Sequence, residues 1–478
     1  KITETGQSAS KSVTLCVGKD LTLTKTAAGS FNRTYLWQIT KDVDQTLVKL
    51  ANGNSYTFHY AVAVAQAGVI DAGWVLKGKI TLTNPNDWED ITLTSLSDVV
   101  SNGGACTVDP GPYKVLAGKT LDVAYTCSYS TLPSSYSGTN TATANWDAAA
   151  AFTPGGSTSG SAAFTLAQSA ATNKIAHVTD TVGGNLGTVT ATDVEPYSSG
   201  TFTYSRTVSG VAGKCTIYDN TATITETGQS ASKSVTVCVG KDLTLTKTAA
   251  GTFDRTYLWK ISKNVDKTLM KIADGDSYTF HYTVDVEQMG VTDAGWTIAG
   301  KITVSNPNDW EDITLASLAD MVDNGGTCTV APGPYVVPKS GSLEVGYSCS
   351  YASAPSSYSG TNTATANWDA ATYFTPSGLA HGTAGFTLAQ ADATNKTVSV
   401  TDSFNGNLGT VSATDSTPFA KASFTYDRAA SGVAGKCTTY DNTATITETG
   451  QSADKSVTLC VGKSLTVSKT AVPSFTRT

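Results

Sequence analysis

The chain repeats itself with a period of 222 residues. The thirteen residues ITETGQSASKSVT begin at Ile2 and again at Ile224, and a third copy from Ile446 differs only at Asp454. Such self-similarity at a fixed period indicates an array of modules. A unit of 222 residues is far longer than a solenoid repeat of ~20–50 residues, so each unit must hold whole domains with their own cores.

Each unit contains a second, shorter pattern. The tetrapeptide NTAT begins at Asn140, Asn220, Asn362 and Asn442, with gaps that alternate between 80 and 142 residues. The alternation predicts one long and one short domain in each unit. We expect long domains at 18–168 and 241–390, short domains at 169–240 and 391–461, the end of a truncated short domain at 1–17 and the start of a truncated long domain at 462–478.

Alternating runs dominate the sequence. LTLTK at 21–25, YTFHY at 56–60 and KITLTN at 79–84 alternate between apolar and polar residues with period two, which is typical of half-buried strands. Turn signals such as NPND, NGG and DPGP separate these runs, and no segment sustains an apolar period of 3.6. Charged residues make up only 15 % of the chain. The sequence therefore predicts an all-β chain of tandem antiparallel β-sandwich domains.

The nine cysteines fall into pairs that recur in each unit, 21 residues apart in the long domain and 23 in the short one. The predicted disulfides join Cys106 to Cys127, Cys215 to Cys238, Cys328 to Cys349 and Cys437 to Cys460. Cys16 has no partner in this chain, because its counterpart would precede Lys1. No CxxC or His-rich spacing favours zinc, so structural disulfides are the simpler interpretation. Disulfides persist in oxidising compartments, which predicts an extracellular or cell-surface protein.

Other features argue against several classes of function. The net charge is −7 with both signs interspersed, so we expect no nucleic-acid binding. No apolar run approaches the ~18–20 residues of a membrane span. The sequence contains no nucleophile elbow, phosphate loop or zinc helix, so we expect no enzyme and no cofactor. The acidic turns NPNDWED at Asn84 and DGDS at Asp274 could hold calcium through oxygen ligands, but solvated turns are the simpler interpretation.

The runs DLTLTKTA, GNSYTFHYAV, GKITLTNPND and GTNTATA resemble the immunoglobulin-like repeat domain that occurs in tandem in very large bacterial and archaeal surface proteins. The resemblance covers the long domain and the second half of the short one. It implies stalk modules of adhesins, fimbriae or cell-envelope filaments, and related fimbrial modules carry internal lysine–asparagine isopeptide bonds. The long domain departs from a compact module in its large first half, which includes SFNRTYLWQITKDVD.

These observations predict a structural, non-catalytic protein: an extracellular filament or cell-surface stalk. Its partners would be further copies of itself, through self-association or through continuation of the same array. The near-identity of the two units favours a scaffold, because a ligand-binding tip should differ from its neighbours. The alternative is an adhesin that binds a surface glycan through repeated aromatic residues such as Trp88 and Trp310, although tryptophans in such turns more often serve packing.

Strand parity singles out a chemical candidate. Lys25 shares the inward face of its strand with two leucines, and Asn140 shares its face with Ala142 and Ala144, while Asp98 lies between them in the sequence. The candidate isopeptide sets are Lys25, Asp98 and Asn140; Lys174, Asp180 and Asn220; and Lys247, Asp320 and Asn362. A buried neutral amine can attack the amide while the carboxyl moves protons. The alternative is that each lysine reaches solvent at a strand end and each asparagine binds backbone in a turn.

Overall fold

The computed structural model describes residues 1–477, which form two compact units. Unit 1 comprises Lys1–Val48, Ser55–Ser209 and Thr216–Val237, and unit 2 comprises Lys49–Asn54, Gly210–Cys215 and the chain from Cys238 onward. Strands hold 61 % of the residues, and the one helix of the described chain, α1 (Ala370–Tyr373), accounts for 1 %. The predicted all-β class is confirmed.

The strands recur in nearly the same order in the two halves of the sequence. Those before residue 241 are β1 (Thr22–Lys25), β2 (Ala28–Val43), β3 (Leu47–Ala51), β4 (Tyr56–Thr83), β5 (Ile91–Val100), β6 (Ala105–Val108), β7 (Lys114–Val115), β8 (Thr120–Ser128), β9 (Ser137–Trp146), β10 (Ser157–Thr172), β11 (Ile175–Asp180), β12 (Gly184–Thr190), β13 (Ser199–Val208), β14 (Lys214–Ile224) and β15 (Ser230–Gly240). Those after it are β16 (Thr244–Lys247), β17 (Ala250–Val265), β18 (Leu269–Ile272), β19 (Tyr278–Ser305), β20 (Ile313–Thr314), β21 (Ser317–Val322), β22 (Thr327–Val330), β23 (Val336–Val337), β24 (Ser342–Ser350), β25 (Ser359–Asn367), β26 (Leu379–Thr394), β27 (Thr397–Asp402), β28 (Gly406–Ser412), β29 (Lys421–Ala430), β30 (Cys437–Tyr440), β31 (Thr443–Ile446), β32 (Ser452–Asp454) and β33 (Val457–Val461).

The long sandwich of unit 1 is built from strands in the order β6-β8-β4-β2-β10-β9-β5-β7, with β1 also paired to β4. β10 passes between the two layers, because its first half is antiparallel to β9 and its second half is parallel to β2. Alternate residues point inward, as the period-two pattern predicts. The core includes Leu76, Ile80, Ala142, Ala144 and Trp146. In unit 2, β17, β19, β24, β25 and β26 enclose the corresponding core.

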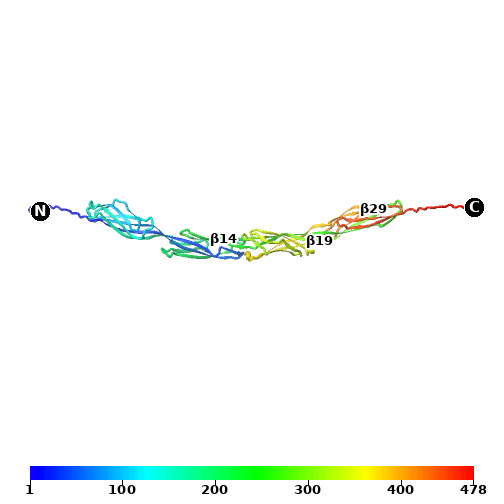
Figure 1. Cartoon of the computed structure of the whole chain (residues 1–478), viewed down its shortest axis with the longest axis horizontal. Helices are drawn as coiled ribbons and strands as arrows, with labels where there is room; N and C mark the ends of the chain where they lie inside the picture. The colour runs from blue at the N-terminus through cyan, green and yellow to red at the C-terminus, as the bar shows by residue number, and fades with distance from the viewer. Residues whose placement is uncertain (478) are drawn as a thin grey trace. The chain divides into compact units, whose positions relative to one another are not determined.

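The short sandwich of unit 1 uses the same two strands, β2 and β4. β13 pairs along the first half of β4, from Ser199 opposite Ala65 to Val208 opposite Tyr56, and the same pairing joins β29 to β19 in unit 2, where Figure 1 labels both strands. This layer packs against β11, β12 and β14. The core contains Tyr35, Trp37, Val62, Val64, Ala176, Val178, Val189, Ala191, Ala222 and Ile224.

The predicted boundaries at 168/169 and 390/391 therefore do not separate the cores, since both fall inside strands, β10 and β26. The large first half of the predicted long domain supplies part of the short sandwich. Strands β2 and β4 pass from one core to the other through a bulge at Gly68, where the pairing shifts between Leu36 and Trp37 and φ is 154°. A bulge bends and twists a strand without ending it, so the strands run unbroken across the true boundary.

The two end segments contain no strand within residues 1–20 and 462–477. Their apolar residues are open to solvent: Leu15 is 86 % exposed, whereas its internal counterpart Val237 is fully buried, and Leu465 is 96 % exposed, whereas its counterpart Leu243 is buried. The interpretation of 1–17 and 462–478 as parts of incomplete domains stays a prediction.

Four disulfides join the pairs that the spacing predicts, and Cys16 is free and exposed. Cys106 lies opposite Cys127 on β6 and β8, and Cys437 lies opposite Cys460 on β30 and β33. Neighbouring antiparallel strands place such residues side by side.

Candidate cross-linking site

The fold brings together Lys25, Asp98 and Asn140 from three different strands of the long sandwich. Lys25 ends β1, Asp98 lies on β5 and Asn140 lies on β9. The Lys25 amine donates to Asp98 Oδ1, and neither side chain is exposed to solvent. Asn140 Nδ2 donates to Asp98 Oδ2 at 3.0 Å. The carboxyl therefore contacts the amine with one oxygen and the carboxamide with the other.

Unit 2 builds the same set from Lys247, Asp320 and Asn362. Lys247 donates to Asp320 Oδ1, and both side chains are again fully buried. Asn362 is buried on β25, which pairs with the strand that carries Asp320. Its Nδ2 lies 3.4 Å from Cys349 Sγ. The buried lysine–aspartate pair and the buried asparagine thus recur in both units, and both lysines face inward, not toward solvent.

Burial controls the charge of this site. Desolvation lowers the pKa of Lys25 and of Lys247 below the ordinary lysine value, although the hydrogen bond and charge of the neighbouring aspartate act in the opposite direction. The Tyr125 ring lies 3.9 Å from the Lys25 amine. Burial, together with the charge of Asp98, raises the pKa of Tyr125 to about 12, so the phenol stays neutral. Burial therefore shifts the amine toward its neutral form.

One polar atom in each set has no partner. Asn140 Oδ1 and Asn362 Oδ1 are buried and accept no hydrogen bond. An unsatisfied buried polar group costs about 1–3 kcal/mol, and each such case in a folded protein calls for an explanation. As a static hydrogen-bond network, the arrangement is incomplete.

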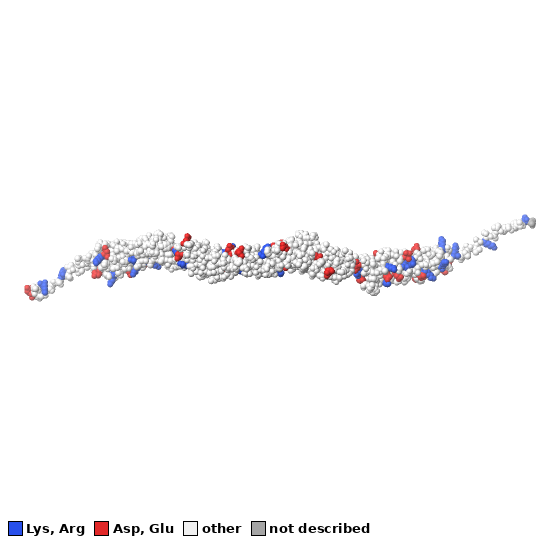
Figure 2. Space-filling model, turned by 90° about the horizontal axis from the view of Figure 1, so that it is seen from below, with Lys and Arg blue, Asp and Glu red and all other residues white. Residues whose placement is uncertain are grey.

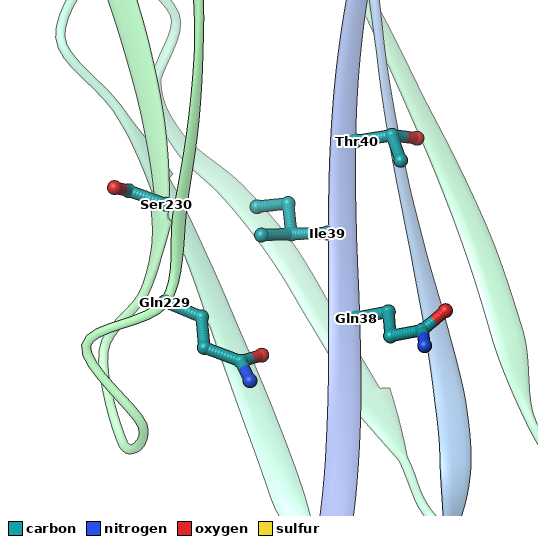
Figure 3. Close-up of a pocket in the computed structure, with 5 residues that line it drawn as sticks. All are labelled: Gln38, Ile39, Thr40, Gln229 and Ser230. Carbon is teal, nitrogen blue, oxygen red and sulfur yellow. The ribbon is translucent and has the colours of Figure 1, made fainter.

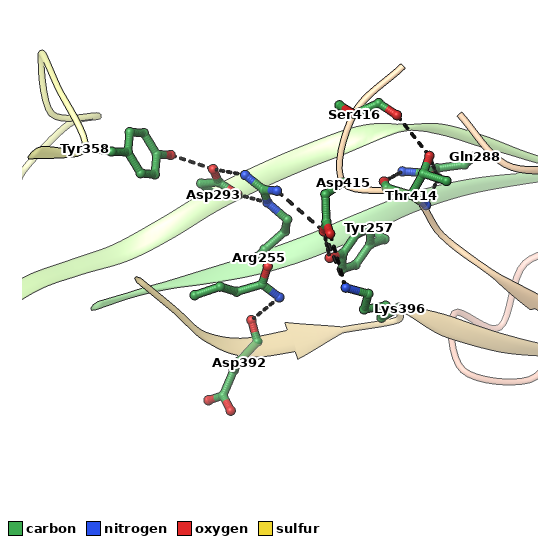
Figure 4. Close-up of polar contacts among 11 residues, drawn as sticks. Arg255, Tyr257, Gln288, Asp293, Tyr358, Asp392, Lys396, Thr414, Asp415 and Ser416 are labelled. Atoms are coloured by element: carbon green, nitrogen blue, oxygen red, sulfur yellow. Dashed lines mark hydrogen bonds and ion pairs between the residues drawn. The ribbon is translucent and has the colours of Figure 1, made fainter. Parts of the chain in front are cut away.

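In the short sandwich, the predicted lysine is the wrong one. Lys174 follows Asn173, whose φ of 60° turns the chain just before β11, and it lies at the surface 3.6 Å from Asp193. Figure 4 shows its counterpart in unit 2, where Lys396 lies 3.3 Å from Asp415, which also accepts the Tyr257 hydroxyl.

These surface lysines belong to a polar cluster that lies where the two sandwiches of a unit meet. In unit 2, Arg255 on β17 binds both oxygens of Asp293 on β19 at 2.7 and 2.8 Å and lies 3.6 Å from Asp415 (Figure 4). Tyr358 from the long sandwich donates to Asp293 as well. Asp415 lies in the short sandwich, so this cluster connects the two.

The place that Lys174 was expected to fill is taken by Lys41 on β2. Its side chain is fully buried, donates to Asp180 and lies 2.6 Å from the Tyr204 hydroxyl. Asn220 Nδ2 donates to the same hydroxyl at 2.7 Å. Unit 2 repeats the set as Lys263, Asp402, Tyr426 and Asn442. Parity offered a signal, because Lys41 shares its strand face with the apolar Ile39 and Val43, but sequence order favoured Lys174.

The short-sandwich set differs chemically from the long-sandwich set. Tyr204 lies between the amine and the carboxamide, and Asn220 Oδ1 accepts from Thr181 at 3.0 Å. Asp180 Oδ1 accepts the backbone N–H of Gly183 at 2.8 Å. Burial alone would raise the pKa of Asp180, but this bond and that of Lys41 outweigh it and hold the pKa below its ordinary value. In this set the carboxyl and the carboxamide oxygen both have hydrogen-bond partners, while burial lowers the pKa of Lys263 in unit 2 as it lowers that of Lys25.

One groove and one acidic turn lie outside these side-chain sets. A groove of about 380 Å³ lies between β2 and the segment before β15, and Figure 3 shows that Ile39 and Gln229 point into it while Thr40 points away. Its five lining residues include no titratable group. Asn84 belongs to the turn that was considered as a calcium site. Its side chain donates to the Glu89 carbonyl at 2.8 Å and so stabilises the turn itself.

Charge and hydropathy add two findings. On the face that Figure 2 shows, basic and acidic residues are scattered among uncharged ones. No helix within residues 1–477 is long and apolar enough to cross a membrane. Asp98, Cys106 and Cys127 lie within 4.8 Å of one another, but the sulfurs are joined in a disulfide, so neither offers a thiolate to a metal.

Neither a protein-family model nor the sequence of a curated protein matches the chain. Among solved structures, it is similar to the cadherin-like domains 1 to 4 of zebrafish RET, at 10 % identity over 79 % of this chain and 97 % of that one, with a TM-score of 0.16. It is also similar to the D1–D4 ectodomain fragment of ICAM-5, at 8 % identity over 88 % and 98 %, with a TM-score of 0.15. TM-scores this low do not support any conclusion about function or family. The resemblance to the bacterial and archaeal repeat family stays a prediction.

Proposed function

We propose that the chain is a non-catalytic structural segment of an extracellular stalk or filament, in which an internal amide bond reinforces each long sandwich. The bonds join Lys25 to Asn140 and Lys247 to Asn362. The observation that carries the proposal is the buried lysine–aspartate contact that recurs in both units, joined in unit 1 by the hydrogen bond from Asn140 to Asp98. The buried side chains of both sets, the lowered lysine pKa and the unpaired carboxamide oxygen support it.

The reaction requires only groups that the chain contains. The neutral Lys25 amine attacks Asn140 Cγ. The Asp98 carboxyl, which contacts both partners, is protonated and holds the one proton that the amine and the carboxyl share. Rotation of the carboxamide would let this carboxyl donate to the unpaired Oδ1 and polarise the carbonyl. The Nζ–Cγ bond forms, the Cγ–Nδ2 bond breaks, and Asp98 passes the amine proton to the leaving group, which departs as ammonia. Each chain reacts once per site, so there is no turnover.

The position of the bond suits a protein that bears tension. Lys25 precedes β2 and β4, and Asn140 follows them. A pull on the chain would pass through the Lys25–Asn140 bond and bypass the residues between, which include the two strands shared by both sandwiches. The disulfides support an extracellular location, because such bonds persist in oxidising compartments. The partners proposed are further copies of the same repeat.

Intact-mass measurement of the oxidised full chain tests the proposal. We expect a mass that is two ammonia molecules below that of the sequence, after the hydrogens lost in four disulfides are subtracted. Proteolysis should release branched peptides that join Lys25 to Asn140 and Lys247 to Asn362. A mass equal to the sequence less the disulfide hydrogens alone refutes the cross-links.

One observation favours the alternative function, a glycan-binding adhesin. Phe152 is 67 % exposed, and its ring lies 6.3 Å from that of Trp88. Exposed aromatic side chains can stack on sugars. A glycan array with the intact chain and with Phe152→Ala separates the two functions: binding that depends on Phe152 supports the adhesin, and no binding counts against it.

A further inference from the structure

A disulfide forms one side of the reacting site in the long sandwich. Asn140 Nδ2 lies 3.6 Å from Cys127 Sγ and 3.7 Å from Cys106 Sγ, and Cys127 Sγ lies 3.7 Å from Asp98 Oδ2. Cys127 has no exposed surface. In unit 2, Cys349 Sγ likewise lies 3.4 Å from Asn362 Nδ2 and 3.6 Å from Asp320 Oδ2. The sulfurs therefore contact the leaving nitrogen and the proton-carrying carboxyl.

We propose that this disulfide is a positioning group for the amide cross-link, so that the Lys25–Asn140 bond forms only after Cys106 and Cys127 are oxidised. The same holds for Cys328 and Cys349 in unit 2. This inference rests on the proposed function and adds a redox requirement to it: closure of the disulfide precedes release of ammonia.

The first reason is hydrogen-bond chemistry. A disulfide sulfur has no proton to donate, so it leaves Asp98 Oδ2 free to accept from Asn140 Nδ2 at 3.0 Å. The same nitrogen also donates to the Val99 carbonyl at 3.2 Å. Two free thiols would each add an S–H donor and occupy more space than the bonded sulfurs. A thiol at Cys127 would reach Asp98, the group that has to move the proton. Oxidation therefore leaves the carboxyl free for the amine and the carboxamide.

The second reason is exclusion of water. Cys106 lies on β6, a strand of four residues at the edge of the sheet that pairs with β8. Short edge strands have few hydrogen bonds to hold them, and the disulfide fixes β6 over the site. If β6 separated from β8, water would reach Lys25 and restore the charge of its amine, because burial is the main cause of its lowered pKa. A charged amine cannot attack the carboxamide.

The short sandwich supplies a matched control. In unit 2, Asn442 Nδ2 donates to the Tyr426 hydroxyl at 2.8 Å, and its Oδ1 accepts from Ser403 at 3.1 Å. The disulfide of that sandwich, Cys437–Cys460, makes no hydrogen bond to these groups within the described residues. Its removal should leave both cross-links unaffected.

The experiment compares the oxidised full chain with two double variants, Cys106→Ala with Cys127→Ala, and Cys437→Ala with Cys460→Ala. We expect two ammonia losses in the wild type and in the second variant, and one in the first, with the Lys25–Asn140 branched peptide missing. Circular dichroism and resistance to trypsin establish that the first variant is folded. Two ammonia losses in a folded first variant overturn the inference, whereas no ammonia loss in the wild type overturns the proposed function.

A second measurement tests the inference if the Cys106→Ala, Cys127→Ala variant does not fold. Wild-type chain produced and purified in reductant should keep both ammonia groups, and addition of oxidised glutathione should close the disulfides before ammonia is released. Ammonia lost in the continued presence of reductant overturns the inference. Ammonia that is released only after disulfide closure supports it.

Discussion

Replacement of Asp98 by Asn removes the proposed cross-link from one unit and leaves the other unit as an internal control. Asparagine has nearly the shape of aspartate and can still bond to the carboxamide of Asn140, but it cannot carry a proton from Lys25 to the leaving ammonia. We expect the intact mass to show one ammonia loss instead of two. The branched peptide from Lys247 and Asn362 should remain.

The effect on stability follows from the loop that the bond closes. Lys25 and Asn140 are 115 residues apart, and the chain-entropy estimate for a cross-link over a loop of that length is about 5 kcal/mol. For a unit of this size, each 1 kcal/mol shifts the midpoint by roughly 2–4 °C, so unit 1 should melt about 10–20 °C below unit 2. Differential scanning calorimetry should resolve two transitions for Asp98→Asn.

Force spectroscopy measures the same bond independently. In the wild type, the residues between Lys25 and Asn140 cannot extend. In Asp98→Asn they can, except for the 21-residue stretch that the Cys106–Cys127 disulfide closes. The remaining ~90 residues at about 3.5 Å each add roughly 30 nm of contour length to unit 1. Two ammonia losses in Asp98→Asn, with an unchanged melting curve and contour length, would refute the role of Asp98.

Lys41→Met should destabilise unit 1 by about 3–5 kcal/mol, because the Asp180 carboxylate would be left buried without its counter-charge; calorimetry measures the shift. Lys174→Met should change neither the melting midpoint nor the number of ammonia losses, and one ammonia loss fewer than in the wild type would contradict its surface position. Acid should destabilise the sandwiches through Asp71, whose pKa is lowered chiefly by its hydrogen bond with Arg33. That contribution is fully present above the unfolded value of ~3.9 and is lost as the pH falls through the lower folded value. Melting curves between pH 2 and 5 check this, since Arg33→Gln should flatten the dependence.

Local pattern was sufficient for several parts of the fold and the site. Period-two alternation predicted the strands, because one face of each strand packs in the core and the other contacts water. The same parity placed Lys25 and Asn140 inside the long sandwich, where the structure has them fully buried as side chains. The cysteine spacing predicted pairs that lie opposite each other on neighbouring antiparallel strands.

The error at Lys174 shows where local pattern stops. Parity states which face of a strand a residue occupies, but not which distant strand that face will meet. Lys174 matched the order of residues in the long domain, yet it lies outside β11 at the surface, and Lys41 approaches Asp180 from a strand 139 residues earlier. Only the path of β2 through both sandwiches decides that contact.

The sequence by itself determined the repeat, the all-β class, the disulfide pairs and the long-sandwich triad, because each depends on period, parity or spacing along one chain. The tertiary structure decided that β2 and β4 serve two cores, that Lys41 occupies the buried site of the short sandwich, and that the disulfide lies against Asn140. The reason is physical: a bulge such as that at Gly68 redirects a strand without ending it, so the choice of partners is made by packing between strands far apart in the sequence.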